Sequence, residues 1–207
     1  MDLTNFYKWR YATKKFDTDK TVDEKDINIL KESIRLSPSS YGLQLFKVLV
    51  IENKELKEKL KRVSFNQPQI SDCSALFVFC NFTKVTSSDI DGFIHLKSSV
   101  QDIMISNLKK YSDFLKSTLL SMPSEEVSIW TTNQVYIALG NLMTSCAALK
   151  IDSCPIEGFQ ADKYNEILNL KNMNAAVVAS VGYRSNDDLS QESKKVRKNS
   201  ASLFEHI

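Results

Sequence analysis

The chain has 207 residues, with 27 Lys and Arg against 25 Asp and Glu, which gives a formal net charge of +2. A hydrophobic fraction of 43% and a charged fraction of 25% are ordinary for a globular protein with a substantial core. The near balance of charge gives no reason to expect a nucleic-acid partner. The N-terminus lacks a basic-then-apolar signal segment, so we expect a mature cytoplasmic protein.

Several common kinds of site are excluded by motif. The four cysteines form no CxxC pair, and we interpret them as reduced thiols rather than metal ligands. The glycines are too far apart for GxGxxG or a P-loop. His95 and His206 form no HExxH zinc motif, and no GxSxG nucleophile elbow occurs. A phosphate-bearing ligand would therefore be held mainly by cationic side chains and polar loops, without a metal.

The first half of the chain predicts alternating helices and strands. A short helix is expected to about Trp9. Thr21-Val22-Asp23-Glu24 fits a capping box that opens a second helix, which Ser37-Pro38 ends. Further along we expect elements over these residues: a strand over 46–51, a charged surface helix over 53–63, and a strand buried on both faces over 75–80.

The second half contains the longest predicted helices. An apolar stripe over 95–120 predicts one helix, ended near Pro123. The segment 127–149 carries no charge and has bilayer length, but its Thr, Asn, Gln and Ser residues make it too polar for a lone membrane span. We therefore predict a buried central helix that also serves as a dimer element. A short helix over 162–168 and a third buried strand over 175–181 follow.

Strands separated by helices, around one long central helix, predict an α/β or α+β fold with a sheet inside a helical coat. The tail, 183–207, is polar and rich in Lys and Arg. It is either a loose end or an arm that docks on a partner.

Two basic segments suit a phosphate group. Arg10 and Lys14 bracket a turn between two predicted helices, where a guanidinium fork and an ammonium match phosphate oxygens. The run 194–198 supplies further cations, and both segments could serve one phosphate. Each taken alone is more often a solvated surface.

Three other loops suit the rest of such a ligand. Pro38, two hydroxyls and Gly42 precede a strand in a loop whose backbone could approach a ligand. The amides of 66–69 offer the donors and acceptors that a pyrimidine-dione edge requires. Glu157-Gly158, within 154–159, could present N–H groups to an acceptor atom. The alternative for each loop is an ordinary turn.

Together these segments resemble the nitroreductase family, in the branch of NAD(P)H-dependent FMN oxidoreductases. The resemblance runs over nearly the whole chain in the same order, and its most specific part is Pro-Ile-Glu-Gly-Phe at 155–159. It implies an α+β fold with a mixed, mainly antiparallel sheet surrounded by helices. It also implies a single FMN-binding domain over 1–207 and an intertwined homodimer, in which 183–207 forms an arm onto the partner subunit.

The resemblance also implies the cofactor-binding residues. Arg10, Lys195 and Arg197 would hold the FMN phosphate, with Tyr11, Ala12 and Lys14 beside it and Lys14 near the pyrimidine edge. Asn66 and Gln69 would face the ring edge or the ribityl chain. Pro38, Ser39 and Ser40 would come from the other subunit, with Gly42 close by. Pro155, Ile156, Glu157 and Gly158 would lie behind the ring, with a backbone N–H directed at flavin N5. Departures from the family pattern at Ala12, Gly42, Leu45 and Gln69 bear on substrate range more than on FMN binding.

The implied activity is two-electron, ping-pong hydride transfer from NADH or NADPH to a quinone or nitroaromatic compound, with FMN performing the chemistry and no catalytic side chain. No membrane and no nucleic acid take part. One alternative is a flavin-binding redox sensor or storage protein without turnover. Others are a helical module whose basic tail grips an acidic partner, and a different reaction of the same superfamily, such as flavin fragmentation or reductive dehalogenation.

Overall fold

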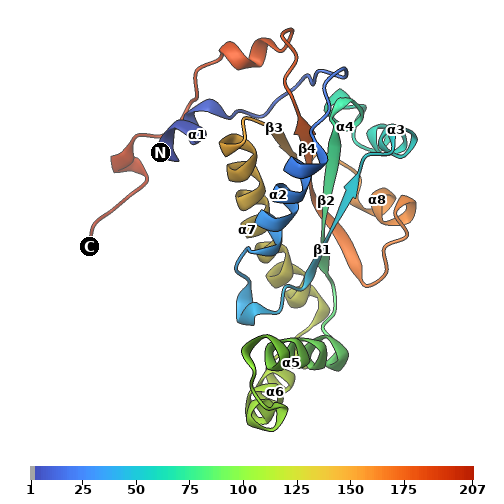
Figure 1. Cartoon of the computed structure of the whole chain (residues 1–207), viewed down its shortest axis with the longest axis vertical. Coiled ribbons are helices and arrows are strands. Elements are labelled where there is room, and N and C mark those ends of the chain that lie inside the picture. The colour runs from blue at the N-terminus through green and yellow to red at the C-terminus, as the bar shows by residue number, and fades with distance from the viewer. Residues whose placement is uncertain (1–2) are drawn as a thin grey trace.

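The computed structural model of the chain describes residues 3–207, which form a four-stranded sheet between helical layers (Figure 1). The strand order is β1–β2–β4–β3, for strands Phe46–Ile51, Ala75–Phe82, Met173–Gly182 and Asp152–Ile156. All three ladders are antiparallel, and a parallel pairing occurs at the isolated bridge between Ala12 and Ser153. The predicted α+β fold with a mainly antiparallel sheet is confirmed.

One face of the sheet is covered by α2 (Glu24–Arg35) and α7 (Ser124–Ala148). Leu30 and Ile34 of α2 pack with Leu142 of α7 in the same core cluster as the inward side chains of β2 and β4. The predicted central helix is confirmed as α7, whose uncharged part runs along the sheet. The described chain contains no helix that is long and apolar enough to cross a membrane.

The other face is covered by α3 (Lys54–Arg62), α4 (Pro68–Asp72) and α8 (Ala161–Ile167). Tyr164 of α8 is fully buried there, and its hydroxyl shares a 2.7 Å hydrogen bond with Ser64 Oγ. Because β2 and β4 lie between both helical layers, their residues are almost all buried. The predicted strand at 75–80 and surface helix at 53–63 are confirmed. All four cysteines lie buried as free thiols within residues 3–207.

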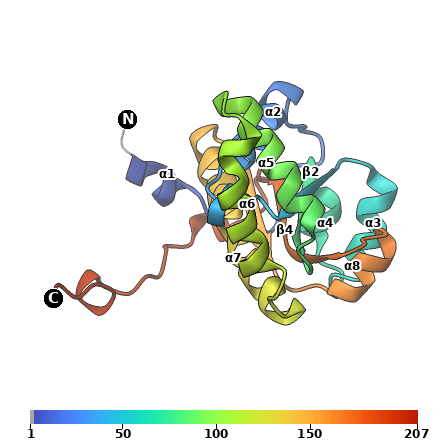
Figure 2. The ribbon, with the colours of Figure 1, turned by 90° about the horizontal axis from the view of Figure 1, so that it is seen from below.

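A helical hairpin extends away from the sheet (Figures 1 and 2). It consists of α5 (Ser87–Gln101) and α6 (Ile105–Leu119), so the single helix predicted over 95–120 is wrong. Asp102 adopts a left-handed conformation (φ 52°) that ends α5. Val100 and Met104 are 76% and 69% exposed, because they lie at this break and not on one continuous buried stripe.

The start of α2 also differs from the prediction. The helix begins at Glu24 with Asp23 at its N-cap, and Asp23 makes no side-chain capping bond among the described residues. Val22 is only 3% exposed and its N–H donates to Ser74 Oγ at 3.2 Å. This anchoring keeps Thr21-Val22 extended, so Thr21 cannot cap the helix. The predicted capping box at Thr21 is therefore wrong.

The strand β3 was missed, because Cys154-Pro155 suggested a turn. Pro155 pairs with Ala179 of β4, and β3 is an edge strand of the sheet. Proline is tolerated on an edge strand, where its missing N–H need not complete a ladder. The predicted strand at 175–181 is β4, which is the fourth strand and runs over Met173–Gly182.

The helix α1 and the beginning of the C-terminal tail lie at the same end of the sheet. The helix α1 (Leu3–Trp9) packs beside α7, and the tail after β4 passes it and extends beyond the domain (Figures 1 and 2). The tail contains the 3₁₀ turns η2 (Leu189–Glu192) and η3 (Ser200–Ser202), and residues 191–207 are all exposed.

Candidate functional site

A buried carboxylate joins the start of β3 to the end of β4. Asp152 is 4% exposed, and its Oδ1 accepts Arg184 Nε at 2.8 Å and Nη2 at 2.5 Å. Its Oδ2 accepts the backbone N–H of Arg184 at 2.9 Å. The hydroxyl of Thr13 donates to Oδ1 at 3.4 Å, so the N-terminal segment is tied to the same carboxylate.

The guanidinium of Arg184 also contacts two aromatic rings. It lies 4.3 Å from the ring centroid of Trp9 and 4.6 Å from that of Tyr11. These cation–π contacts each stabilise by about 0.5–1 kcal/mol where solvent reaches them. Trp9 and Tyr11 flank Arg10, and the N–H of Arg10 donates to the carbonyl oxygen of Phe6 at 3.1 Å at the end of α1. The chain is therefore held on both sides of Arg10.

Asp188 joins the N-terminal segment to the beginning of the tail. Its Oδ2 accepts the hydroxyl of Tyr11 at 2.9 Å and the backbone N–H groups of Lys14 and Lys15 at 2.7 and 3.2 Å. Burial acts to raise the pKa of Asp188, but these bonds and one from Ser190 N–H together lower it. Burial and the bond to Asp188 raise the pKa of Tyr11 to about 12.

These contacts bring three cations together, and we call Arg10, Lys195 and Arg197 the cationic cluster. Lys195 Nζ donates to the carbonyl oxygen of Arg10. Burial lowers the pKa of Arg10, and the charge of Arg197 lowers it further. Although Lys195 is exposed, partial desolvation of its ammonium group lowers its pKa, and the charges of Arg10 and Arg197 lower it further. The cluster therefore holds like charges close together.

The cluster contains an unused donor. Arg10 Nε is buried and has no hydrogen-bond partner among residues 3–207. A buried donor without a partner costs free energy, and guanidinium groups bind anionic oxygens strongly. The arrangement can therefore accept an anion with several oxygen atoms, such as a phosphate group.

An open apolar pocket lies farther along β3. Its volume is about 310 Å³, and these residues of α7, β3 and β4 line it: Tyr136, Leu139, Met143, Pro155, Glu157 and Val177. The hydroxyl of Tyr136 donates to Glu157 Oε1 at 2.6 Å. The bridge between Ala12 and Ser153 lies two to four residues before this wall. At about 3.3 Å per strand residue, the bridge and the wall are roughly 7–13 Å apart.

The loop that contains Asn66 lies against the turn after β3. Gln67 Nε2 donates to the carbonyl oxygen of Gly158 at 2.6 Å, and a Cβ at Gly158 would lie 3.9 Å from Phe65 Cδ2. Phe65 and Asn66 both have positive φ, which turns the chain sharply at this point. Gln69 is 5% exposed and donates to Gln67 Oε1 at 3.1 Å, so its amide faces into its own loop.

The loop with Pro38, Ser39, Ser40 and Gly42 contacts α7 and does not lie along β3. The N–H of Ser40 donates to Gln134 Oε1 of α7 at 2.7 Å. Gln134 lies on the flank of α7 away from Tyr136 and Met143, by the 3.6-residue helical repeat. The structure thus arranges most predicted site residues along β3, namely Arg10, Tyr11, Ala12, Lys14, Asn66, Gln69, Pro155, Ile156, Glu157, Gly158, Lys195 and Arg197. It does not bring Pro38, Ser39, Ser40 and Gly42 to them within one chain.

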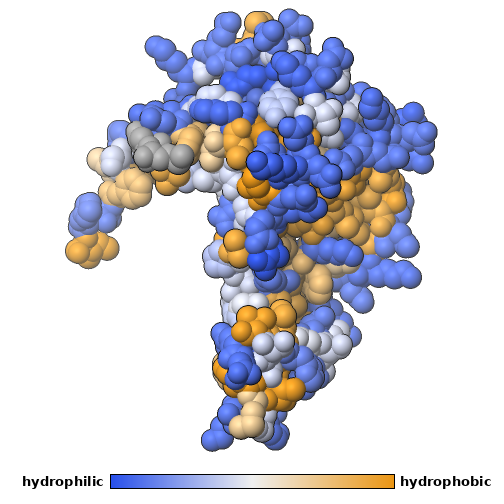
Figure 3. Space-filling model, in the orientation of Figure 1, coloured by the Kyte–Doolittle hydropathy of each residue, from blue (hydrophilic) through white to orange (hydrophobic). Residues whose placement is uncertain are grey.

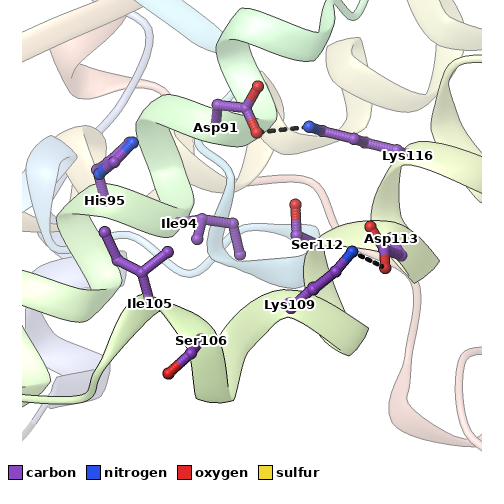
Figure 4. Close-up of a pocket in the computed structure, with 9 residues that line it drawn as sticks. All are labelled: Asp91, Ile94, His95, Ile105, Ser106, Lys109, Ser112, Asp113 and Lys116. Carbon is purple, nitrogen blue, oxygen red and sulfur yellow. Dashed lines mark hydrogen bonds and ion pairs between the residues drawn. The ribbon is translucent and has the colours of Figure 1, made fainter.

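A second cavity, of about 280 Å³, lies in the helical hairpin between α5 and α6 (Figure 4). Lys116 pairs with Asp91 at 2.6 Å, and Lys109 with Asp113 at 3.1 Å. These charges already neutralise each other, and none of the four side chains is buried. The cavity therefore lacks the buried, unsatisfied donor of the first site.

Sequence reasoning missed the residues that support the cationic cluster. Asp152, Arg184 and Asp188 are distant in sequence from Arg10, and their partners follow no motif. One signal was available: Asp152 is the single charge in the otherwise uncharged stretch 151–156, and Arg184 follows soon after a buried strand. A lone acid in a buried strand requires a partner.

Comparison with known proteins identifies the family. The family model described as "Nitroreductase family" matches residues 7–183. A provisionally named NAD(P)H nitroreductase of Staphylococcus epidermidis is 37% identical, over 99% of this chain and 96% of its own.

Solved structures share the fold. One from Exiguobacterium sibiricum, entitled a nitroreductase in complex with FMN, has a TM-score of 0.85 at 19% identity, over 100% of this chain and 98% of that one. Another from S. epidermidis, entitled an NAD(P)H:FMN oxidoreductase, has a TM-score of 0.88 at 17% identity, over 100% and 96%. The predicted family is therefore confirmed, and this chain belongs to the nitroreductase family.

Proposed function

We propose that this protein binds FMN and uses it to transfer electron pairs from NADH or NADPH to a small oxidant, a quinone or a nitroaromatic compound. The observation that carries the proposal is the cationic cluster, with its buried and unpartnered Arg10 Nε. The FMN in the Exiguobacterium relative and the name of the Staphylococcus relative support the cofactor and the electron donor.

The residues along β3 fit the parts of FMN in order. Arg10, Lys195 and Arg197 would bind the phosphate, because they supply several N–H donors and an uncompensated positive charge. The ring would lie toward Pro155 and Gly158, where the pocket wall is apolar on the α7 side. Asn66 would reach the polar ring edge or the ribityl chain, and Lys14 would place a cation near the pyrimidine edge. Arg10 lies two residues before the bridge between Ala12 and Ser153, and that bridge is roughly 7–13 Å from the wall, which suits a cofactor whose anionic and aromatic parts are joined by a flexible chain.

When FMN is bound, it supplies reversible acceptance and donation of a hydride. The chain's own residues then bind, orient and partly shield the site. Leu139 and Met143 keep the α7 side apolar. Burial and the bond to Glu157 raise the pKa of Tyr136 to about 12, so its hydroxyl stays protonated near neutral pH. That proton is already donated to Glu157, and we assign no side chain as a general acid.

We also propose that a second copy of the chain completes the protein as a homodimer. Ile129, Ile137 and Tyr136, in the uncharged part of α7, are 61%, 42% and 41% exposed. Such apolar exposure on a long helix is typical of an interface. A contact between two copies would cover this face.

The arm, residues 183–207, supports the same proposal. Its Val196, Leu203 and Phe204 are 89%, 57% and 67% exposed. Apolar surface also lies open beside α2 over the sheet (Figure 3), where Phe46, Val48 and other residues line a hollow next to the edge strand β1. A free strand edge with apolar flanks accepts an extended segment readily. We propose that each arm docks on the other copy and that residues 1–207 fold as one domain.

Purification followed by a visible spectrum and identification of the released chromophore tests the cofactor. Arg10→Ala and Arg197→Ala should each weaken FMN binding about 10- to 150-fold, because a charge-assisted contact contributes roughly 1.5–3 kcal/mol. Lys163→Ala is the control, since Lys163 is an exposed cation on α8 that pairs with Glu166. If both cluster variants bind FMN as tightly as the parent, the phosphate assignment is wrong.

Turnover is tested separately. The yellow protein should oxidise NADH or NADPH when menadione or a nitroaromatic compound is supplied, with parallel lines in double-reciprocal plots. A protein that binds FMN but gives no turnover with either nucleotide would instead support a sensor or storage role.

A further inference from the structure

The loop that contains Ser39 and Ser40 has an unusual backbone. Tyr41, Gly42 and Gln44 have φ values of 57°, 76° and 48°. Residues other than glycine rarely adopt this region, and a stretch with several such residues persists only when its surroundings hold it. The loop is therefore not a relaxed surface turn, and its support must come from neighbouring elements.

Two amide side chains of α7 supply that support. Gln134 is 8% exposed, accepts the N–H of Ser40 at 2.7 Å and donates to the carbonyl of Trp130 at 3.1 Å. Asn141 Nδ2 donates to Ser37 Oγ at 2.8 Å. The two amides are seven residues apart, about two helical turns, so they lie on one flank of α7. Their hydrogen bonds fix Ser37 and Ser40, the two ends of the segment that precedes the positive-φ residues.

This support fixes what Ser39 can do. Its Oγ accepts the N–H of Gln44 at 3.0 Å, which uses a lone pair and leaves the hydroxyl proton available. A serine hydroxyl is one donor and a double acceptor. The held loop therefore offers the hydroxyl of Ser39 as a donor to a ligand outside the loop.

The ligand cannot be in the site of the same chain. Leu139, Met143 and Tyr136 line the β3 pocket from one flank of α7, whereas Gln134 and Asn141 lie on the other. The helical repeat separates these flanks by about 140–220°, and a helix with side chains is about 10 Å across. The body of α7 thus stands between the loop and its own β3 pocket.

We propose that Gln134, assisted by Asn141, is a positioning residue for the FMN site of the second copy. It would act through the loop of residues 37–44, whose Ser39 hydroxyl it orients across the interface. The inference rests on the proposed function and the proposed homodimer. Each α7 would then serve two sites, since its Met143 flank lines the site of its own chain and its Gln134 flank supports the loop given to the other.

The first test uses homodimers. Gln134→Leu should weaken FMN binding about 5- to 50-fold, because the N–H of Ser40 loses its acceptor and the loop relaxes. Gln101→Leu, the same exchange at an exposed position of α5, should bind FMN like the parent. If Gln134→Leu fails to fold, Asn141→Ala removes the other anchor and replaces it in both tests.

The decisive test is a heterodimer of two differently tagged chains, one with Arg10→Ala and one with Gln134→Leu, isolated by tandem affinity purification. If Gln134 acts across the interface, one site carries both lesions and the other carries none. FMN titration should then show one site per dimer with parent affinity. Two weakened sites, one with the affinity of the Arg10→Ala homodimer and the other with that of the Gln134→Leu homodimer, would mean that Gln134 acts within its own chain and would overturn the inference.

The outcomes separate this inference from the proposed function. If the parent binds no FMN, the proposed function fails and the inference fails with it. If the parent binds FMN but the Arg10→Ala homodimer binds it equally well, the phosphate assignment is wrong and the inference, which uses Arg10 to mark a site, falls with that assignment. If Arg10→Ala weakens binding but both sites of the heterodimer are weakened, the proposed function stands and only the role of Gln134 is wrong. A simple structural defect in α7 would lower binding in the chain that carries it, so it would not leave one intact site.

Discussion

Replacing Arg184 by methionine should be among the most damaging single changes outside the sheet. The variant keeps a long side chain but removes the guanidinium from Asp152, which is 4% exposed. Loss of one partner of a buried ion pair costs about 3–5 kcal/mol, because the remaining charge stays buried. Arg184 itself is 22% exposed, so water can partly replace it, and we take the lower end of that range. The retained backbone N–H of Arg184 limits the loss further, while the lost contacts with Trp9 and Tyr11 add about 0.5–1 kcal/mol each. We expect a total loss of roughly 3–4 kcal/mol.

Arg35→Met is the matched control. Arg35 donates to Glu32 from Nε and Nη2, both at 2.6 Å, so the geometry is as good as that of the buried pair. Its side chain is 66% exposed and that of Glu32 is 48% exposed. Exposed pairs contribute about 0–1 kcal/mol, so the control should lose no more than that.

Urea unfolding followed by circular dichroism, on cofactor-free protein at one fixed concentration, measures both free energies. If the two variants lose the same stability within about 0.5 kcal/mol, burial is not what makes the Asp152 contact strong.

Two further changes test other contacts. Asp188→Asn should destabilise the protein near neutral pH and lose its effect in acid, as urea unfolding from about pH 7 to pH 3 would measure. The folded state lowers the pKa of Asp188, so its carboxylate contributes stability above its ordinary pKa. That contribution is lost as the pH falls through the lowered value. A stability difference that persists unchanged in acid would contradict this prediction. Gly182→Ala should cost about 1–3 kcal/mol, because the new Cβ would lie 2.8 Å from Phe16 Cδ1, inside a packed core. Gly92→Ala, in α5 with nothing within 4 Å, should instead stabilise by about 1 kcal/mol, and equal thermal shifts in both variants would refute the packing argument.

The elements with strong local signals could be predicted from the sequence. The strand at 75–80 is a continuous apolar run, and the helix at 127–149 combines length with the absence of charge, so burial alone determines both. The errors occur where one residue overrides a pattern. Asp102 adopts a left-handed conformation and divides the stripe at 95–120, and Pro155 suggested a turn although it lies on an edge strand. Neither outcome follows from periodicity, because both depend on tertiary neighbours.

For the cations of the candidate site, the sequence could not show which arginine has a partner and which has none. Arg10 and Arg184 are both arginines near strand or helix ends, and sequence reasoning could nominate only the one within a recognised segment. In the structure the two arginines have opposite electrostatic environments. Arg184 is neutralised by Asp152, whereas Arg10 keeps a buried Nε without a partner among the described residues. The difference comes from contacts between residues 32 positions apart or more, which no local pattern encodes.

This division of roles has a physical consequence for the cluster. Three neighbouring cations repel one another, and this repulsion adds to desolvation, the larger cause, in lowering the pKa values of Arg10 and Lys195. The cluster would therefore separate if its segments were free to move. The bond from Lys195 Nζ to the carbonyl oxygen of Arg10 joins two members of the cluster directly. The bonds of Asp188 to Tyr11 and to the backbone N–H groups of Lys14 and Lys15 hold the N-terminal segment beside the start of the tail. Because these contacts bring the cations together before any ligand binds, an incoming phosphate does not have to do so. Its full attraction to the preformed positive site therefore contributes to binding.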